Sequence, residues 1–219
     1  MQRDKPFHTL GLWCGVIGPI LWLTLLALAG ALRPDFSHIT NYISELGERG
    51  SGTEALVRYG AFAFTGFLYL YFAGALPGAL RVGWPAVVAA SLIALEGVGR
   101  MGAGVFPCDP GCEPISPLHR LFATVGFCSG ILAALWIGVL VRRVPRLRPL
   151  SSFSVASGTI AFVSLAVMSW GGQTTLPAGL LEHLATVVLS IWLLVFAGRL
   201  VGSDGDGARG VRGAAGVIE

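Results

Sequence analysis

Residues Leu10–Leu32 read LGLWCGVIGPILWLTLLALAGAL, and this stretch decides the class of protein. It is 23 residues long and holds no Asp, Glu, Lys, Arg or His. An apolar helix of about 20 residues is long enough to cross a hydrocarbon core roughly 30 Å thick. The stretch therefore predicts a membrane-spanning helix.

Five further apolar stretches alternate with charged segments along the chain. Helices are expected, because open sheets leave backbone groups unpaired in lipid and the alternating pattern of a membrane barrel is absent. The predicted fold class is an all-α integral membrane bundle of six transmembrane helices. A cytoplasmic segment at 1–9 and a disordered cytoplasmic tail at 202–219 flank the transmembrane domain at 10–201. The five further predicted spans are Leu56–Leu76, Gly83–Val105, Leu118–Val141, Phe153–Trp170 and Ala178–Val201.

The composition supports this class of protein. Charged residues make up 12% of the chain and the mean hydropathy is +0.72, whereas soluble domains carry about 25% charged residues. This excludes a disordered chain, a coiled coil and a nucleic-acid-binding protein. The lipid bilayer is the expected partner.

The charges between the spans predict the orientation. Segments on one side hold ten Lys and Arg against four Asp and Glu, and segments on the other hold three Arg against six Asp and Glu. Because short cytoplasmic loops are enriched in Lys and Arg, both termini are expected in the cytoplasm of a multi-pass plasma-membrane protein. The basic side holds Arg3, Lys5, Arg81, Arg142, Arg143, Arg146, Arg148, Arg199, Arg209 and Arg212.

Small residues inside the spans predict close helix packing. Gly126 and Gly130 form a GxxxG pair, and glycines also crowd the end of the third span; such positions let helix backbones approach closely. The fifth span carries several Ser and Thr residues, so it is expected to lie against other helices rather than lipid.

The first outer loop predicts a short interfacial helix. Apolar residues recur at helical spacing between Asp35, a possible N-cap, and Gly47, a possible end. The opposite side carries Asn41, Ser44 and Glu45. Such a helix either seals the bundle with its polar face in water or turns that face inward over a cavity.

The second outer loop carries two cysteines, Cys108 and Cys112, around a Pro-Gly turn and Asp109. On the outer side of a membrane two such thiols are expected to form a disulfide. A structural staple is favoured over redox catalysis, because thioredoxin-type sites have two residues between their cysteines rather than three.

Four charged residues lie inside or at the ends of the spans. Glu96 and Arg100 are four residues apart and can pair on one helix face, Arg120 lies early in the fourth span, and Glu182 precedes His183 in the sixth. Ionisable groups in spans usually face the bundle interior. They form either a structural ion pair or a polar pocket, and Arg100 and Arg120 could hold an anionic head group.

Three histidines, His38, His119 and His183, map to the outward half of the chain. With nearby carboxylates they could hold zinc with an open position for water. None of their spacings is a recognised zinc signature such as HExxH.

Three of these segments together resemble a known family. Asn41–Gly47, the stretch Gly104–Asp109 followed by Leu118-His119, and Gly179–His183 resemble, in this order, motifs of prokaryotic six-helix membrane proteins catalogued as Domain of Unknown Function 998. The resemblance covers about residues 10–200. It implies a six-helix bundle with an outward-facing polar site, and it implies no activity.

Three functions therefore stay open. The first is binding of a lipid or small anionic ligand, and the second is zinc-dependent lipid hydrolysis. The third is proton-coupled transport with Glu96 or Glu182 as the proton carrier. Ten residues are the candidates for lining the ligand site: Asn41, Ser44, Glu45, Glu96, Arg100, Asp109, His119, Arg120, Glu182 and His183.

Overall fold

The computed structural model describes residues 5–112, 115–170 and 177–215, and it is all-α within these ranges. Six of its helices are long and apolar enough to cross a membrane, which confirms the number of spans predicted from the sequence. The main helices are α1 (Lys5–Ala31), α2 (Thr65–Leu80), α3 (Trp84–Val105), α4 (Pro117–Leu140), α5 (Ser151–Ser169) and α6 (Ala178–Ala215).

Two of the spans are longer than their α-helices. The second begins with a π-helical segment, η2 (Leu56–Phe64), which continues directly into α2. The fifth begins with a 3-10 helix, η5 (Pro145–Leu150), so it runs from Pro145 to Ser169 rather than from Phe153. A shorter 3-10 helix, η4 (Val141–Arg143), ends the fourth span.

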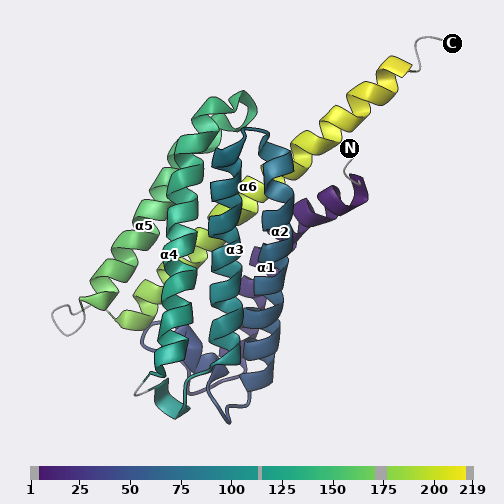
Figure 1. The fold of residues 1–219 in the computed structure, drawn as a ribbon. Helices are drawn as coiled ribbons and strands as arrows, with labels where there is room; N and C mark the ends of the chain where they lie inside the picture. Colours follow the sequence, from purple (N-terminus) through teal and green to yellow (C-terminus); the bar gives the residue numbers. More distant parts are fainter. Residues whose placement is uncertain (1–4, 113–114, 171–176, 216–219) are drawn as a thin grey trace.

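The six helices form a closed ring (Figure 1). Each helix packs against its neighbours in sequence, and α6 closes the ring by packing against α1 and α5. Large buried side chains fill the middle of the bundle. Trp192 and Phe196 stack with ring centroids 6.0 Å apart, and Phe72 meets Phe196 edge to face.

The two ends of the bundle differ in charge. The start of α1, the turns α2–α3 and α4–α5, and the end of α6 lie at one end, from which α6 extends away from the bundle (Figure 1). We call this the basic end, because Arg81 and the arginines between α4 and α5 lie in its turns. The opposite end carries the α1–α2 and α3–α4 connections with Asp35, Glu48 and Asp109, and we call it the acidic end.

Glycines allow α3 to approach both of its neighbours. A Cβ on Gly99 would meet the backbone of Gly126 on α4, and a Cβ on Gly97 would lie 2.6 Å from the Gly66 carbonyl oxygen on the second span. A Cβ on Gly130 would lie 3.0 Å from the Glu96 carboxyl carbon. The predicted close approach of helix backbones is confirmed, and it leaves room for a charged side chain between α3 and α4.

The fifth span packs against α4 and α6, as expected, but more of it is exposed than the expectation implies. Only 33% of its most apolar stretch is buried, against 44–56% in the other five spans, so it is the least enclosed span. Ser154, Ser157 and Ser164 do face inward. Ser164 donates to a carbonyl of its own helix rather than across an interface, and the remaining faces of the helix are exposed.

The helix predicted over Asp35–Gly47 is shorter than expected. Turns occupy the first part, and only the 3-10 helix η1 (Ile43–Gly47) forms. Asp35 pairs with Arg33 instead of capping a helix. The Asn41 side chain accepts the Ser37 backbone N–H at 3.0 Å. Local bonds of this kind compete with helix formation.

Candidate functional site

A cavity lies inside the ring in the acidic half of the bundle. About 50 Å³ of it is open to the centres of water-sized molecules, within about 530 Å³ of empty space that includes its opening to solvent. Its walls are mainly aromatic and aliphatic with a few polar groups. The lining residues are Trp22, Ile43, Ser44, Phe62, Glu96, Gly99, Arg100, Ala103, His119, Phe122, Ala123, Gly126, Phe127, Glu182, Thr186 and Leu189.

The cavity contains an ion pair on α3. Arg100 Nη2 lies 2.9 Å from Glu96 Oε1, and the Glu96 residue is 4% exposed. The Arg100 guanidinium also lies between two rings, 4.2 Å from the Trp22 ring centroid and 4.6 Å from that of Tyr69. Rings and carboxylate together fix the position of the guanidinium.

Several donors around this pair have no hydrogen-bond partner among the described residues. They are Arg100 Nε and Nη1, Trp22 Nε1, the Tyr69 hydroxyl and the Thr186 hydroxyl. A buried polar group without a partner costs about 1–3 kcal/mol. The cavity lining therefore includes unpartnered N–H groups of Arg100 and Trp22 and the hydroxyl of Thr186, which can donate or accept.

Glu182 joins α6 to the first loop at the acidic end. Its Oε2 accepts the backbone N–H of Ile43 at 2.8 Å. No Lys, Arg or His of the described chain forms a salt bridge with it. Thr186 lies one turn further along α6 and faces the same cavity.

His119 has a defined tautomer. Its Nδ1 lies 2.8 Å from the Phe106 carbonyl oxygen and 3.2 Å from that of Ala103. Carbonyl oxygens only accept, so Nδ1 carries the proton. In the neutral ring Nε2 is then a hydrogen-bond acceptor, on a side chain that lines the cavity.

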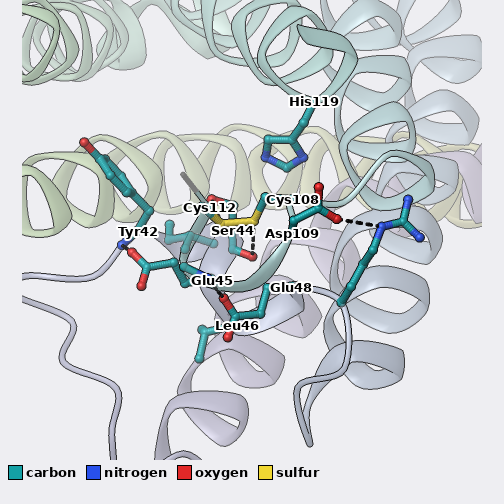
Figure 2. Close-up of a disulfide and its surroundings, with 12 residues drawn as sticks. Tyr42, Ser44, Glu45, Leu46, Glu48, Cys108, Asp109, Cys112 and His119 are labelled. Atoms are coloured by element: carbon teal, nitrogen blue, oxygen red, sulfur yellow. Dashed lines mark hydrogen bonds and ion pairs between the residues drawn. A yellow bond between two sulfur atoms is a disulfide. The ribbon is translucent and has the colours of Figure 1, made fainter. Parts of the chain in front are cut away.

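The disulfide between Cys108 and Cys112 lies next to Ser44 of η1 (Figure 2). Cys112 Sγ lies 3.6 Å from the Ser44 hydroxyl, and Cys108 Sγ lies 3.5 Å from the Ser44 carbonyl oxygen. The Gly111 backbone N–H donates to Glu48 at 2.6 Å. The α3–α4 connection thereby holds η1 in place, and η1 supplies Ile43 and Ser44 to the cavity. This arrangement is that of a structural staple.

Half of the ten candidate residues lie elsewhere. Asn41 donates to Glu45 at 2.6 Å, and Glu45 also accepts the Tyr42 backbone N–H, so these two side chains shape the loop before η1. Asp109 is exposed and pairs with Arg49 at 3.2 Å. Arg120 is exposed and lines a separate, open hollow. The fifth, His183, is described next.

His38 of the α1–α2 connection pairs with His183 on α6. His183 Nδ1 donates to the Gly179 carbonyl at 2.8 Å, so its Nε2 accepts from His38 Nδ1 at 2.9 Å. His119 takes no part in this pair. Among the described residues no three His, Cys, Asp or Glu side chains are arranged to hold a metal ion.

Several lining residues gave no signal in the sequence. Trp22, Phe62, Phe122 and Leu189 are apolar residues within apolar spans. A helix that is apolar all round shows no face by periodicity. The cation–π contact of Trp22 with Arg100 joins α1 to α3, and only the packing of the ring reveals it.

Two carboxylates outside the spans have lowered pKa values. The Arg33 guanidinium donates to Asp35 and holds the pKa of that carboxyl below its ordinary value. For Glu54 the main cause of the lowered pKa is the Gly50 backbone N–H, followed by Arg58. Both groups belong to the network that orders the acidic end.

These features define a class: an all-α membrane protein with six candidate spans and a partly polar cavity in one half of its bundle. The chain belongs to the family described as "Protein of unknown function (DUF998)", which matches residues 16–199. This match confirms the resemblance seen in the sequence motifs. Neither the curated proteins nor the solved structures searched contain a match.

Proposed function

We propose that this protein binds one amphiphile, a lipid or a lipid-like small molecule, in the cavity of the acidic half. The observation that carries the proposal is the Arg100 guanidinium. It is fixed by Glu96 and two rings, and its Nε and Nη1 lack partners among the described residues in a cavity with mainly apolar walls.

The unpartnered donors define the head of the ligand. Arg100, Trp22 and Thr186 offer N–H and O–H groups, so the ligand brings acceptor oxygens such as those of phosphate, carboxylate or ester groups. Since Glu96 already balances the charge of Arg100, the head needs no full negative charge to be bound. Phe122 and Phe127 supply apolar surface for the rest of the molecule.

The acidic end faces outward in this proposal. Two independent features support that orientation: the excess of arginine at the opposite end, and the Cys108–Cys112 disulfide, which suits an oxidising compartment. The ligand therefore belongs to the outer leaflet of the plasma membrane or to the space outside it.

Native mass spectrometry of the protein purified in a mild detergent tests the proposal. The wild-type chain is expected to retain about one amphiphile per protein. The variant Glu96→Gln/Arg100→Gln removes both charges together, so no buried charge is left unpaired. It is expected to lose at least about 90% of that occupancy, since hydrogen bonds to a charged donor are worth about 1.5–3 kcal/mol each.

The matched control is Arg148→Gln, which removes an exposed arginine at the basic end and should keep full occupancy. A second variant, Ala123→Leu, fills the cavity without touching a charge and should also reduce occupancy. Equal occupancy in the wild type, the Gln/Gln variant and Ala123→Leu, all folded by size exclusion and thermal melting, would refute the proposal.

Proton-coupled transport is a second candidate, favoured by one observation. Two carboxylates, Glu96 and Glu182, line the same cavity on different helices, and carboxylates embedded in spans can carry protons. Uptake into proteoliposomes driven by a pH gradient and abolished by Glu182→Gln would support transport. Unchanged uptake in this variant would remove Glu182 as the carrier.

A further inference from the structure

We infer that the ligand head carries a primary ammonium group beside its acceptor oxygens, as the head of an ethanolamine phospholipid does. This inference rests on the proposed function, because it assumes that an amphiphile occupies the cavity. It deepens that proposal by naming the chemical class of the head group, which the donors near Arg100 leave open.

The first reason is a carboxylate without a cationic partner. Glu182 lines the cavity, and the one hydrogen bond found for it among the described residues is the Ile43 backbone N–H on Oε2. In contrast, Glu96 in the same cavity has Arg100. A charge inside a membrane span is costly unless it is paired, so a ligand cation next to Glu182 would complete the site.

The second reason is that the cavity also offers a neutral acceptor. His119 Nδ1 donates to backbone carbonyls, which leaves the Nε2 lone pair of the neutral ring for an incoming donor. The free Oε1 of Glu182 and this nitrogen both accept hydrogen bonds. A primary ammonium carries three N–H donors, whereas a quaternary ammonium carries none.

The third reason is the depth of these groups. At about 1.5 Å per helical residue, Arg100 lies roughly 8 Å from the acidic end of α3, His119 roughly 3 Å and Glu182 roughly 6 Å from the acidic ends of α4 and α6. The depths of Arg100, His119 and Glu182 below the acidic ends of their helices therefore differ by only about 5 Å, whereas Trp22 and Thr186 lie deeper. A single head group can present oxygen to Arg100 and ammonium to Glu182.

The charge count within the cavity agrees with a zwitterion. Glu96 and Arg100 cancel, so an ionised Glu182 leaves one negative charge among the lining residues. A purely anionic head would meet this charge unpaired. A purely cationic head would satisfy Glu182 and leave the Arg100 and Trp22 N–H donors without an acceptor.

The test is a lipid series with identical acyl chains, titrated against the purified protein by native mass spectrometry. The heads are phosphoethanolamine, its N-methyl and N,N-dimethyl forms, phosphocholine and phosphoglycerol. Because each methyl group removes one N–H donor, affinity should fall along the series. The unmethylated lipid should bind about tenfold tighter than the choline and glycerol lipids, a difference of about 1.4 kcal/mol.

Glu182→Gln should reduce this preference to less than about twofold, because the charge that selects the ammonium is gone. The matched control, Glu54→Gln, removes a carboxylate of the acidic end that lies outside the cavity lining and should keep the preference. A folded Glu182→Gln protein that keeps the full preference would overturn the inference. So would a wild-type protein that binds all five lipids equally.

The two proposals fail in different ways. If binding is equal for all heads but is lost in Glu96→Gln/Arg100→Gln, only the ammonium inference is overturned. If no lipid depends on Glu96 and Arg100, the proposed function itself fails. Soluble O-phosphoethanolamine should not compete at millimolar concentration; competition by it would support the head-group chemistry and assign its source to a soluble molecule.

Discussion

The Glu96–Arg100 pair gives the sharpest prediction for the stability of the bundle. Arg100→Met removes the cation and leaves the Glu96 carboxylate buried at 4% exposure with no partner. Removing one member of a buried pair typically costs about 3–5 kcal/mol. The variant also loses two cation–π contacts, at 4.2 and 4.6 Å, so we expect the upper half of that range.

A second substitution should restore part of the loss. In Glu96→Met/Arg100→Met no buried charge remains, and two flexible apolar side chains occupy the space of the pair, one facing α4 and the other the Trp22 and Tyr69 rings. We expect the double variant to be about 2–3 kcal/mol more stable than Arg100→Met alone, because buried pairs replaced by apolar residues of similar volume are often tolerated. The two substitutions are therefore strongly coupled.

Thermal unfolding in one detergent measures this coupling. For chains of 150–250 residues about 1 kcal/mol corresponds to roughly 2–4 °C, so the double variant should melt roughly 4–12 °C above Arg100→Met. Arg148→Met at the basic end is the control and should melt within about 1 °C of the wild type, since an exposed substitution changes little. A double variant whose loss equals the sum of the single losses would refute the reasoning.

Three further predictions concern packing, orientation and pH. Gly99→Ala should reduce the free energy of unfolding by about 1–3 kcal/mol and lower the melting temperature, because the added Cβ would meet the backbone of α4. Gly198→Ala should raise the melting temperature slightly, because nothing lies within 4 Å of the added Cβ. The reverse order of melting temperatures would contradict the packing of α3 on α4. With the other two cysteines replaced by serine, an impermeant maleimide should label Cys108 and Cys112 in intact cells only after reduction, and labelling only in permeabilised cells would contradict the orientation. The pKa of Asp35 is lowered from its ordinary value of 3.8, so its ion pair with Arg33 stabilises the fold above that pH and is lost as the pH falls through the lowered value. The melting temperature of Asp35→Asn should therefore change less with pH between about 2 and 5 than that of the wild type.

The spans could be predicted from the sequence because one physical requirement determines them. Crossing lipid demands about 20 apolar residues in a helix, and the second span begins at Leu56 as expected. The start of the fifth span was misplaced because Arg146 and Arg148 lie in η5. Their long side chains leave the apolar segment while the backbone stays helical.

The segment Asp35–Gly47 does not form the single helix that its periodicity predicts, because contacts distant in the sequence shape it. Its periodicity predicts one helix, but Glu45 bonds Asn41 and the Tyr42 backbone, and Glu182 on α6 takes the Ile43 N–H. These contacts replace helical hydrogen bonds. The partner from α6 lies 139 residues away in the sequence, so no local pattern could indicate it.

The four charged residues inside or at the ends of the spans indicate the position of the candidate site better than the apolar residues around them do. Three of them, Glu96, Arg100 and Glu182, come from two helices and line one cavity, while Arg120 lies outside it. Glycines on α3 and α4 make this possible, because a Cβ on Gly130 would press on the Glu96 carboxylate. The same small residues that close the helix contacts therefore also create the space for the charges. Packing and polar site are coupled, so a substitution at Gly130 should alter both stability and ligand occupancy.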